Sequence, residues 1–250
     1  GAPAIGSFSF QSAGKKRMSI GLGADNESAG LLKGSAVRLF SSYNLPVGKD
    51  GFFRFGMSLG AAWNRVDVNG LSFASPDQDP VYVTLVQSNT APLLGVGLSF
   101  HTKTFHIGLS APAMFEADFL SVNTFSKGEF KPLDRLILHG SHRLYLSDNQ
   151  SVFETYFNYR INQVLPSQAE LAGILHLKEK LWLGAGWKQQ FGISAMAGFN
   201  LSKSLAVGYS YALKTSGAGQ IGLPSHELQL GMLLGKRPKG VQGYSFINSE

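Results

Sequence analysis

The sequence contains no cysteine, few charged residues and no long apolar run. Without cysteine, disulfides, zinc–thiolate sites and cysteine nucleophiles are all excluded. Charged residues are only 15% of the 250 residues, whereas soluble domains carry about 25%. No stretch of about 18 apolar residues occurs, so the sequence predicts no transmembrane helix. These absences argue against both a soluble enzyme and a helical membrane protein.

Apolar residues are nevertheless abundant, and they alternate with small or polar ones. Hydrophobic residues make up 44% of the chain, aromatic residues 12%, and there are 30 glycines. Between residues 53 and 64, for example, Phe55, Met57 and Leu59 alternate with Gly56 and Ser58. Apolar residues at every second position indicate β-strands with one apolar face.

This alternation predicts roughly thirteen strands of the length that a tilted membrane strand needs, nine to eleven residues. They start near Ile5, Met18, Gly34, Phe52, Leu93, Phe105, Arg135, Ser151, Ala169, Leu181, Gly192, Leu205 and Ser225. The connections alternate between two kinds. The short ones are Ala13–Arg17, Gly48–Gly51, Thr102–Thr104, Ser147–Gln150, Lys178–Lys180 and Leu201–Ser204. The mostly longer ones are Asp25–Lys33, Asn69–Pro92, Pro112–Asp134, Ile161–Gln168, Thr215–Pro224 and the short exception Gln189–Phe191.

Short turns at one rim and long loops at the other are typical of bacterial outer-membrane barrels. The sequence therefore predicts an all-β fold, an antiparallel up-and-down transmembrane β-barrel of about fourteen strands, over residues 1–235. Residues 236–250 are expected to form a basic, polar periplasmic tail, of which 240–250 is a possible docking peptide. Because strand pattern begins almost at once after Gly1-Ala2-Pro3, we expect a leader and a first strand to be missing.

A soluble β-sandwich also has alternating strands, and the second face of each strand decides between the two folds. A soluble surface would carry many lysines and glutamates, whereas here the second face is mainly Gly, Ser, Ala and Asn. Small residues favour a barrel interior. A charge near the middle of the lipid face costs about 2–4 kcal/mol, so the strand charges are expected to point into the lumen. These candidate lumen charges are Arg38, Arg54, Arg143, Glu154, Arg160 and Glu227.

Basic residues concentrate at the short turns and near the end of the chain, and the formal net charge is +6. Two interpretations are open: turns that contact anionic headgroups, or a rim whose charge steers a periplasmic partner. Basic residues confined to turns, without interleaved stacking aromatics, do not favour nucleic acid. The candidate periplasmic docking rim comprises Lys15, Lys16, Arg17, Lys49, Lys103, Lys178, Lys180, Lys203, Lys236, Arg237 and Lys239.

Catalytic and metal motifs are weak. Gly56–Gly60 matches the G-x-S-x-G pattern, which requires a strand-to-helix elbow rather than the middle of a strand. Neighbours on a strand face opposite ways, so Ser225-His226-Glu227 is no triad, and His139 with His142 is no chelating pair. Asp77-Gln78-Asp79 lacks the oxygen count of a calcium loop. We expect no catalytic residue, no metal and no cofactor.

Aromatic residues are distributed as in an interfacial girdle, which supports the fold and identifies no ligand. The candidates are Trp63, Trp182, Trp187, Tyr43, Tyr159, Tyr209 and Tyr211.

Several segments together carry a family resemblance. They are LWLGAGWK at residues 181–188, LAVGYSY at 205–211 followed by SHEL at 225–228, Gly1-Ala2-Pro3, and residues 96–112. In this order they resemble a tryptophan-containing strand, the closing hairpin, the segment after the first strand and a central hairpin of the PorP/SprF family of outer-membrane proteins of the type IX secretion system. The strand near residue 153 departs from the family, since Phe153-Glu154-Thr155 stands where a Pro-Ser pair is common.

The resemblance implies a non-enzymatic protein of the bacterial outer membrane that acts in type IX secretion or gliding motility. Its implied partners are periplasmic secretion-machinery proteins, the lipid of the outer membrane and a large secreted adhesin held through its C-terminal domain. We expect the basic rim and the loops 69–92 and 112–134 to bind partners. Two alternatives remain at this stage, because a fold alone does not determine function. One is a diffusion channel or transporter of hydrophobic substrates, and the other is a lipid-hydrolysing enzyme.

Overall fold

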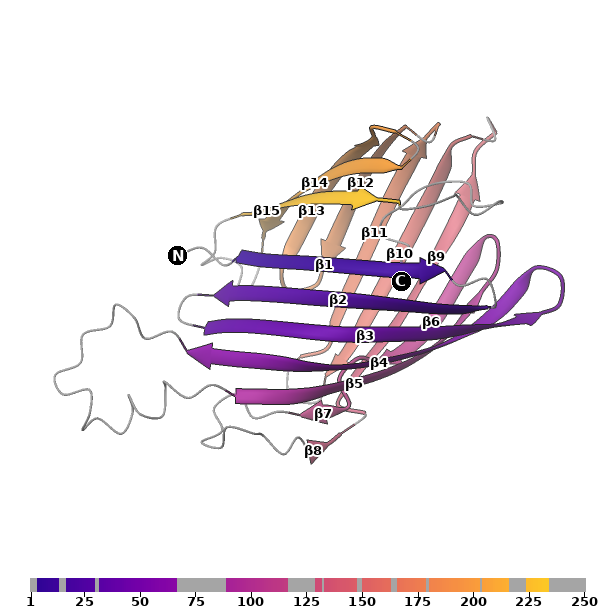
Figure 1. Ribbon diagram of the computed structural model, residues 1–250. Coiled ribbons are helices and arrows are strands. Elements are labelled where there is room, and N and C mark those ends of the chain that lie inside the picture. The colour runs from indigo at the N-terminus through magenta and orange to yellow at the C-terminus, as the bar shows by residue number, and fades with distance from the viewer. Residues whose placement is uncertain are drawn as a thin grey trace, which may run out of the picture. The chain divides into compact units, whose positions relative to one another are not determined.

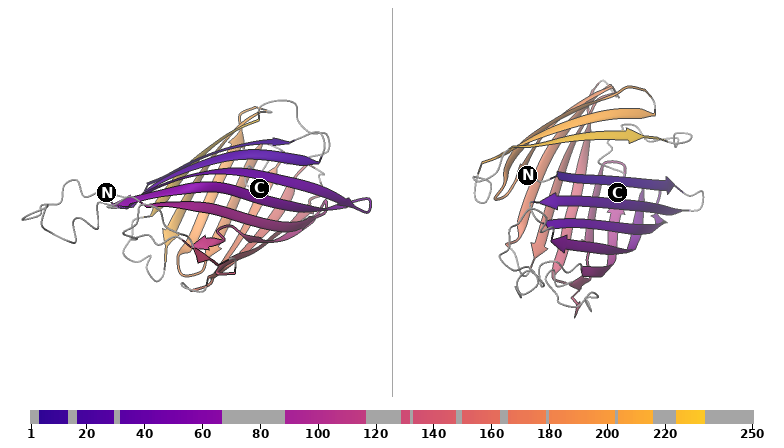
Figure 2. Two further views of the ribbon diagram at one scale, coloured as in Figure 1. Left: turned by 60° about the horizontal axis from the view of Figure 1, so that its bottom comes forward. Right: turned by 60° about the vertical axis from the view of Figure 1, so that its left-hand side comes forward.

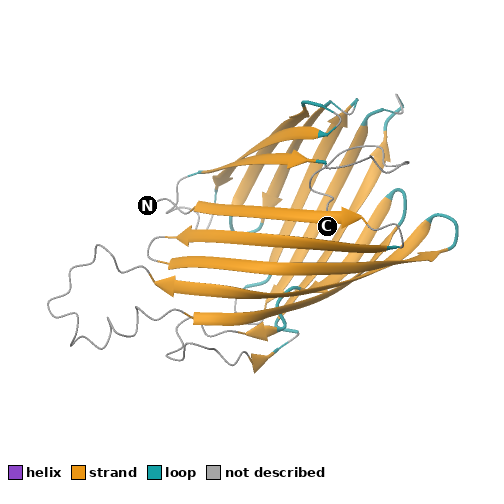
Figure 3. Cartoon of the chain, viewed as in Figure 1, coloured by secondary structure: helices purple, strands orange, loops and turns teal. Residues whose placement is uncertain are grey.

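The computed structural model describes residues 4–13, 17–29, 32–66, 89–116, 129–131, 133–147, 150–162, 166–178, 180–202, 204–215 and 224–233. Regular structure in these residues consists of β-strands joined by turns (Figure 3). Within the same residues, no helix is long and apolar enough to cross a membrane.

Thirteen strands form one antiparallel sheet in the order β1-β2-β3-β4-β5-β6-β9-β10-β11-β12-β13-β14-β15 (Figure 1). Apart from the β7–β8 excursion, neighbours in this order are neighbours in the chain, which is the predicted up-and-down arrangement. The strands are β1 Ala4–Ala13, β2 Met18–Ala29, β3 Leu32–Val47, β4 Gly51–Val66, β5 Asn89–His101, β6 Phe105–Ala111, β9 Arg135–Tyr145, β10 Val152–Asn162, β11 Gln168–Leu177, β12 Leu181–Lys188, β13 Gly192–Asn200, β14 Leu205–Lys214 and β15 Ser225–Met232. Among the described residues, the predicted number of sheet strands is confirmed. Each strand starts within about four residues of its predicted start.

Three of the predicted long connections differ from the structure. β2 runs to Ala29 and β3 begins at Leu32, so most of the predicted loop 25–33 is strand. Asp25 pairs with Ala36, and the β2–β3 ladder continues to Ala29. The end of the strand was predicted where the apolar residues stop, but the hydrogen-bonded pairing runs further. In the predicted loop 112–134, two short strands pair with each other, β7 Phe115–Glu116 with β8 Glu129–Phe130. Residues 89–92 of the predicted loop 69–92 belong to β5, and the rest of that loop lies outside the described residues, as does the whole tail 236–250.

The chain divides into two compact units. Unit 1 contains Gly1–Ser99 and Leu109–Leu136, and unit 2 contains Phe100–Gly108 and Ile137–Glu250. The division cuts across β5, β6 and β9, and each unit is described by itself.

Unit 1 is built on four long neighbouring strands, β1 to β4, which lie side by side in both views of Figure 2. The register aligns Phe10, Leu22, Leu39 and Leu59 in one row across them. All four side chains are exposed, Leu59 at 60%. Because side chains alternate along each strand, this row belongs to an apolar face, and a polar face lies behind it.

In unit 2, the strands from β10 to β15 also have one apolar face and one polar face. Phe157, Leu171, Trp187, Ile193 and Leu213 form one row of its apolar face, all of them exposed. The opposite, polar face is closely packed in places. There the register aligns Val152, His176, Trp182, Gly198, Gly208 and Gln229.

Trp182 corrects the predicted aromatic girdle. It is only 7% exposed and lies on the polar face of unit 2, whereas Trp187, five residues later, is 45% exposed on the apolar face. The physical reason is strand parity, since residues an odd number apart point to opposite sides. Trp182 has room because its neighbours on β13 and β14 are Gly198 and Gly208, where any Cβ would meet the indole ring.

Candidate functional site

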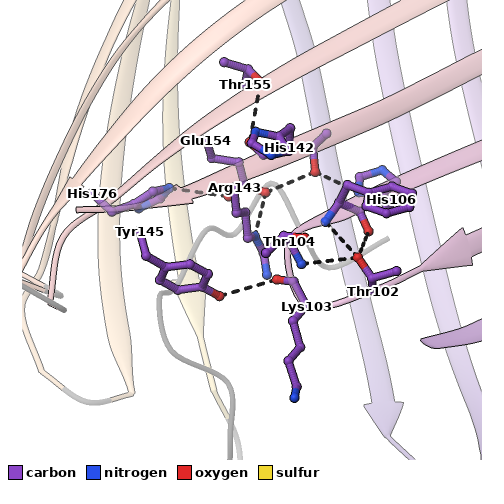
Figure 4. A network of polar contacts seen from close by, with 12 residues as sticks. Thr102, Lys103, Thr104, His106, His142, Arg143, Tyr145, Glu154, Thr155 and His176 are labelled. Atoms are coloured by element: carbon purple, nitrogen blue, oxygen red, sulfur yellow. Dashed lines mark hydrogen bonds and ion pairs between the residues drawn. The ribbon is translucent and has the colours of Figure 1, made fainter. Parts of the chain in front are cut away.

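Glu154 is the centre of a polar cluster on the polar face of unit 2. It is 2% exposed, and Arg143 Nε on the neighbouring strand β9 donates to its Oε1 at 2.9 Å. The Ser141 hydroxyl donates to the same oxygen at 3.2 Å. On the other side, His176 Nε2 of β11 lies 3.8 Å from Glu154 Oε2 (Figure 4). A buried carboxylate needs such partners, because leaving it without them would cost several kcal/mol.

The cluster continues toward β6 through two further histidines. His106 Nδ1 lies 2.8 Å from Ser141 Oγ, and His106 Nε2 lies 3.4 Å from His139 Nδ1. The ring of His101 stacks on that of His106, with centroids 5.2 Å apart. Sequence reasoning missed this cluster, because its members come from strands whose register the sequence does not show. The dismissal of His139 with His142 agrees with the structure, since His142 is exposed on the other side of β9.

The Ser141–His106 contact does not reproduce the arrangement of a hydrolase. In a serine hydrolase the third group orients the histidine, while the serine oxygen stays open for attack. Here the carboxylate of Glu154 accepts from the serine itself, and the second nitrogen of His106 meets another imidazole. Ser141 is also buried. These contacts are those of a structural or proton-binding network.

The other candidate lumen charges are also on polar faces. In unit 1, Arg38 forms an ion pair with Asp25 across β2 and β3. Arg54 Nε donates to Asn44 Oδ1 at 2.9 Å. In unit 2, Glu227 Oε1 accepts from Gln229 Nε2 at 2.8 Å, and its Oε2 accepts from Ser210 Oγ at 3.4 Å. Arg160 is exposed near the end of β10. Of these candidate charges, Arg143 and Glu154 contact each other.

Two short turns of unit 2, at Thr102 and at Ser202, have the same hydrogen-bond pattern. The backbone N–H of Thr102 donates to Phe105 O at 2.8 Å, and its hydroxyl accepts from the N–H groups of Thr104 and Phe105 at 3.3 and 3.1 Å. This closes a tight turn with Lys103 exposed at its tip. Ser202 makes the equivalent bonds to Ser204 and Leu205, so the pattern of hydroxyl, lysine, hydroxyl and apolar residue occurs twice.

The remaining rim candidates fall into two groups. Arg17, Lys49, Lys178 and Lys180 are exposed at the turns where they were predicted. Arg17 and Lys178 have positive φ angles of 64° and 47°, as tight turns between antiparallel strands require. The others lie outside the described residues: Lys15, Lys16, Lys203, Lys236, Arg237 and Lys239.

The sequence motifs with catalytic resemblance occupy ordinary strand positions. Gly56, Ser58 and Gly60 lie within the continuous strand β4. His226 Nδ1 contacts the Tyr209 hydroxyl at 2.6 Å on the apolar face of unit 2, while Glu227 bonds on the polar face. Among the residues that the structure describes, no group of three or more His, Asp or Glu side chains could hold a metal ion.

Comparison with known proteins agrees with this architecture. None of the curated proteins compared matches the sequence. A family model does match, described as type IX secretion system membrane protein PorP/SprF, and it covers residues 1–232. The match spans all the strands of the sheet. The chain therefore belongs to the PorP/SprF family of type IX secretion system membrane proteins.

Proposed function

We propose that this chain is an outer-membrane component of the type IX secretion and gliding machinery that docks or anchors secreted surface proteins and contacts periplasmic partners. The family places it in the secretion system as a membrane protein. Two exposed apolar faces support contact with the hydrocarbon of a bilayer, because each continues across at least four neighbouring strands. Proteins that fold in water rarely expose so much contiguous apolar surface.

The observation that carries the docking role is the set of lysine-bearing turns in unit 2. The hydroxyl of Thr102 accepts from two N–H groups in the turn of Lys103. In the turn of Lys178, the N–H of Lys180 donates to Leu177 O at 3.0 Å. Rigid turns lower the entropy cost of binding, and like charges at one end of the strands attract an acidic partner surface. In an outer-membrane barrel the short turns face the periplasm, so we assign these lysines to periplasmic partners.

A pull-down from native outer membranes tests this role. The tagged full-length protein should retain a very large surface protein or periplasmic components of the machinery in stoichiometric amounts. The triple variant K103E/K178E/K180E should lose at least the periplasmic components. The control variant K33E/R65E reverses charges at the ends of β3 and β4 that lie away from their shared turn and should retain the periplasmic components. Equal retention by both variants would contradict a docking role for the lysine turns.

The alternative of an open diffusion channel makes a different prediction. Buried Ile174, Glu154 and Trp182 fill part of the polar face of unit 2, and Arg143 neutralises the only carboxylate of that cluster. Such a surface does not favour a passage lined by free charges. We expect the purified protein to show no stable single-channel conductance in planar bilayers. A reproducible conductance that changes with the charge of Arg160 or Glu227 would favour the channel.

A further inference from the structure

The histidine cluster of unit 2 contains a chain of hydrogen bonds whose direction can be assigned. Glu154 is ionised, because Arg143 donates to its Oε1 at 2.9 Å and a buried neutral acid would leave that guanidinium without a counter-ion. An ionised carboxylate only accepts. The Ser141 hydroxyl therefore gives its hydrogen to Glu154, since otherwise two oxygen lone pairs would face each other at 3.2 Å.

The direction of the serine hydroxyl determines the tautomer of His106. With its hydrogen on Glu154, Ser141 Oγ must accept from His106 at 2.8 Å, so the hydrogen of His106 is on Nδ1. The other nitrogen, Nε2, is then an acceptor. It faces His139 Nδ1 at 3.4 Å, which must be the donor. Each hydrogen bond in this series therefore runs in the same direction: His139 donates to His106, His106 to Ser141, and Ser141 to Glu154.

Only one hydrogen fits between the two imidazoles. If both rings were fully protonated, all four of their ring nitrogens would carry hydrogens, and two N–H groups would point at each other across 3.4 Å. The pair therefore accepts one additional proton with the contact intact and loses the contact when it accepts a second. Glu154 and Arg143 cancel each other's charge, so they add little net field at the imidazoles.

We propose that His106 and His139, oriented by Ser141 and Glu154, form a proton-binding site that links β6 to β9. Among the described residues, the titratable or charged groups that face it include His101, stacked on His106, and, on neighbouring strands, Arg143 and His176. Protonation of both imidazoles breaks the His106–His139 contact, whereas His106 Nδ1–H still donates to Ser141 Oγ. This inference stands on the hydrogen-bond geometry and does not depend on the docking role.

The site lies next to a lysine-bearing turn. The backbone N–H of Arg143 donates to Thr104 O at 2.6 Å, and the Tyr145 hydroxyl donates to Lys103 O at 3.4 Å. β9 therefore holds the turn at residues 102–104 through two bonds, and His139 lies further along the same strand (Figure 4 shows the turn beside Arg143 and Glu154).

Nitrogen NMR of the full-length protein, labelled with ¹⁵N at histidine and held in detergent micelles, tests the proposal directly. The chain has six histidines, and single His→Gln variants assign their ring signals. At pH 8, long-range ¹H–¹⁵N correlations should show the hydrogen of His106 and of His139 on Nδ1. As the pH falls, the pair should take up one proton with the His139 Nδ1–H tautomer retained and a second proton in a separate step at lower pH, since coupled groups titrate in two macroscopic steps.

Two variants show whether a change in the ring signals comes from losing the Ser141 hydroxyl or from any substitution in β9. Ser141→Ala removes the acceptor of His106 Nδ1–H, and should abolish the Nδ1–H tautomer of His106. His142→Gln, on the same strand but the opposite face, should leave the signals of His106 and His139 unchanged. If wild-type His106 carries its hydrogen on Nε2 at pH 8, or if the pair titrates in one step, the proposed site is wrong.

Discussion

Because Trp182 packs against Gly198 and Gly208, a side chain added at either glycine should lower the free energy of unfolding. An added Cβ at Gly198 would lie 2.6 Å from Trp182 Nε1 and closer still to two ring carbons. An added Cβ at Gly208 would lie 2.7 Å from Cζ2. Non-bonded heavy atoms settle at about 3.5–4.0 Å, so the indole would have to move by roughly 1 Å in a closely packed face. Overpacking of this kind costs about 1–3 kcal/mol.

We therefore expect Gly198→Ala to lower the free energy of unfolding by about 1–3 kcal/mol. Gly56→Ala is the matched control, because its Cβ would meet nothing nearer than 4.0 Å. Alanine there should be neutral or stabilise by up to about 1 kcal/mol, since glycine is entropically unfavourable in a strand. Reversible urea unfolding in detergent micelles, followed by tryptophan fluorescence and by gel mobility of unheated samples, measures both.

A double-mutant cycle tests whether the indole of Trp182 causes the loss of stability on Gly198→Ala, as well as how large that loss is. If the penalty of Gly198→Ala comes from the indole, it should largely disappear in a Trp182→Leu background, with a coupling energy of about 1–3 kcal/mol. An equal penalty with and without the indole would refute the reasoning. So would a control substitution at Gly56 that destabilises as much as the substitution at Gly198.

Three further predictions use the same unfolding measurement. Arg143→Met leaves the buried carboxylate of Glu154 without its cation and should cost about 3–5 kcal/mol; the double variant with Glu154→Gln should recover most of that loss, and no recovery would show that the pair is not the cause. Thr102→Ala removes the acceptor of two turn N–H groups and should cost about 1 kcal/mol, whereas Thr102→Ser should cost little. Equal losses of stability in the two variants would show that the hydroxyl is not the cause. Leu39→Arg, in the middle of β3 on the apolar face, should cost about 2–4 kcal/mol in a bilayer, and Val47→Arg at the turn end about 0–1 kcal/mol; equal costs would contradict lipid contact by this face.

Strand positions and faces could be predicted from the sequence because they depend on local alternation. Phe55, Met57 and Leu59 recur at every second residue, and in the structure all three are exposed on one face of β4. Parity also separates Trp182 from Trp187 without any structure, and applying it would have removed Trp182 from the predicted girdle. The end of β2 was less predictable, since Asp25 and the residues after it stay in the ladder despite being polar.

Contacts between strands required the tertiary structure. His106 meets His139 and Ser141 across 33 and 35 residues of chain, and Trp182 finds its two glycines on the next two strands. Which side chains become neighbours depends on register, and a shift of one residue would turn every side chain of a strand to the other face. Register is decided jointly by turn geometry and by the packing of both faces. The sequence by itself therefore determined the strands, their two faces and the family resemblance, whereas the hydrogen-bonded cluster around Glu154 emerged only from the folded sheet.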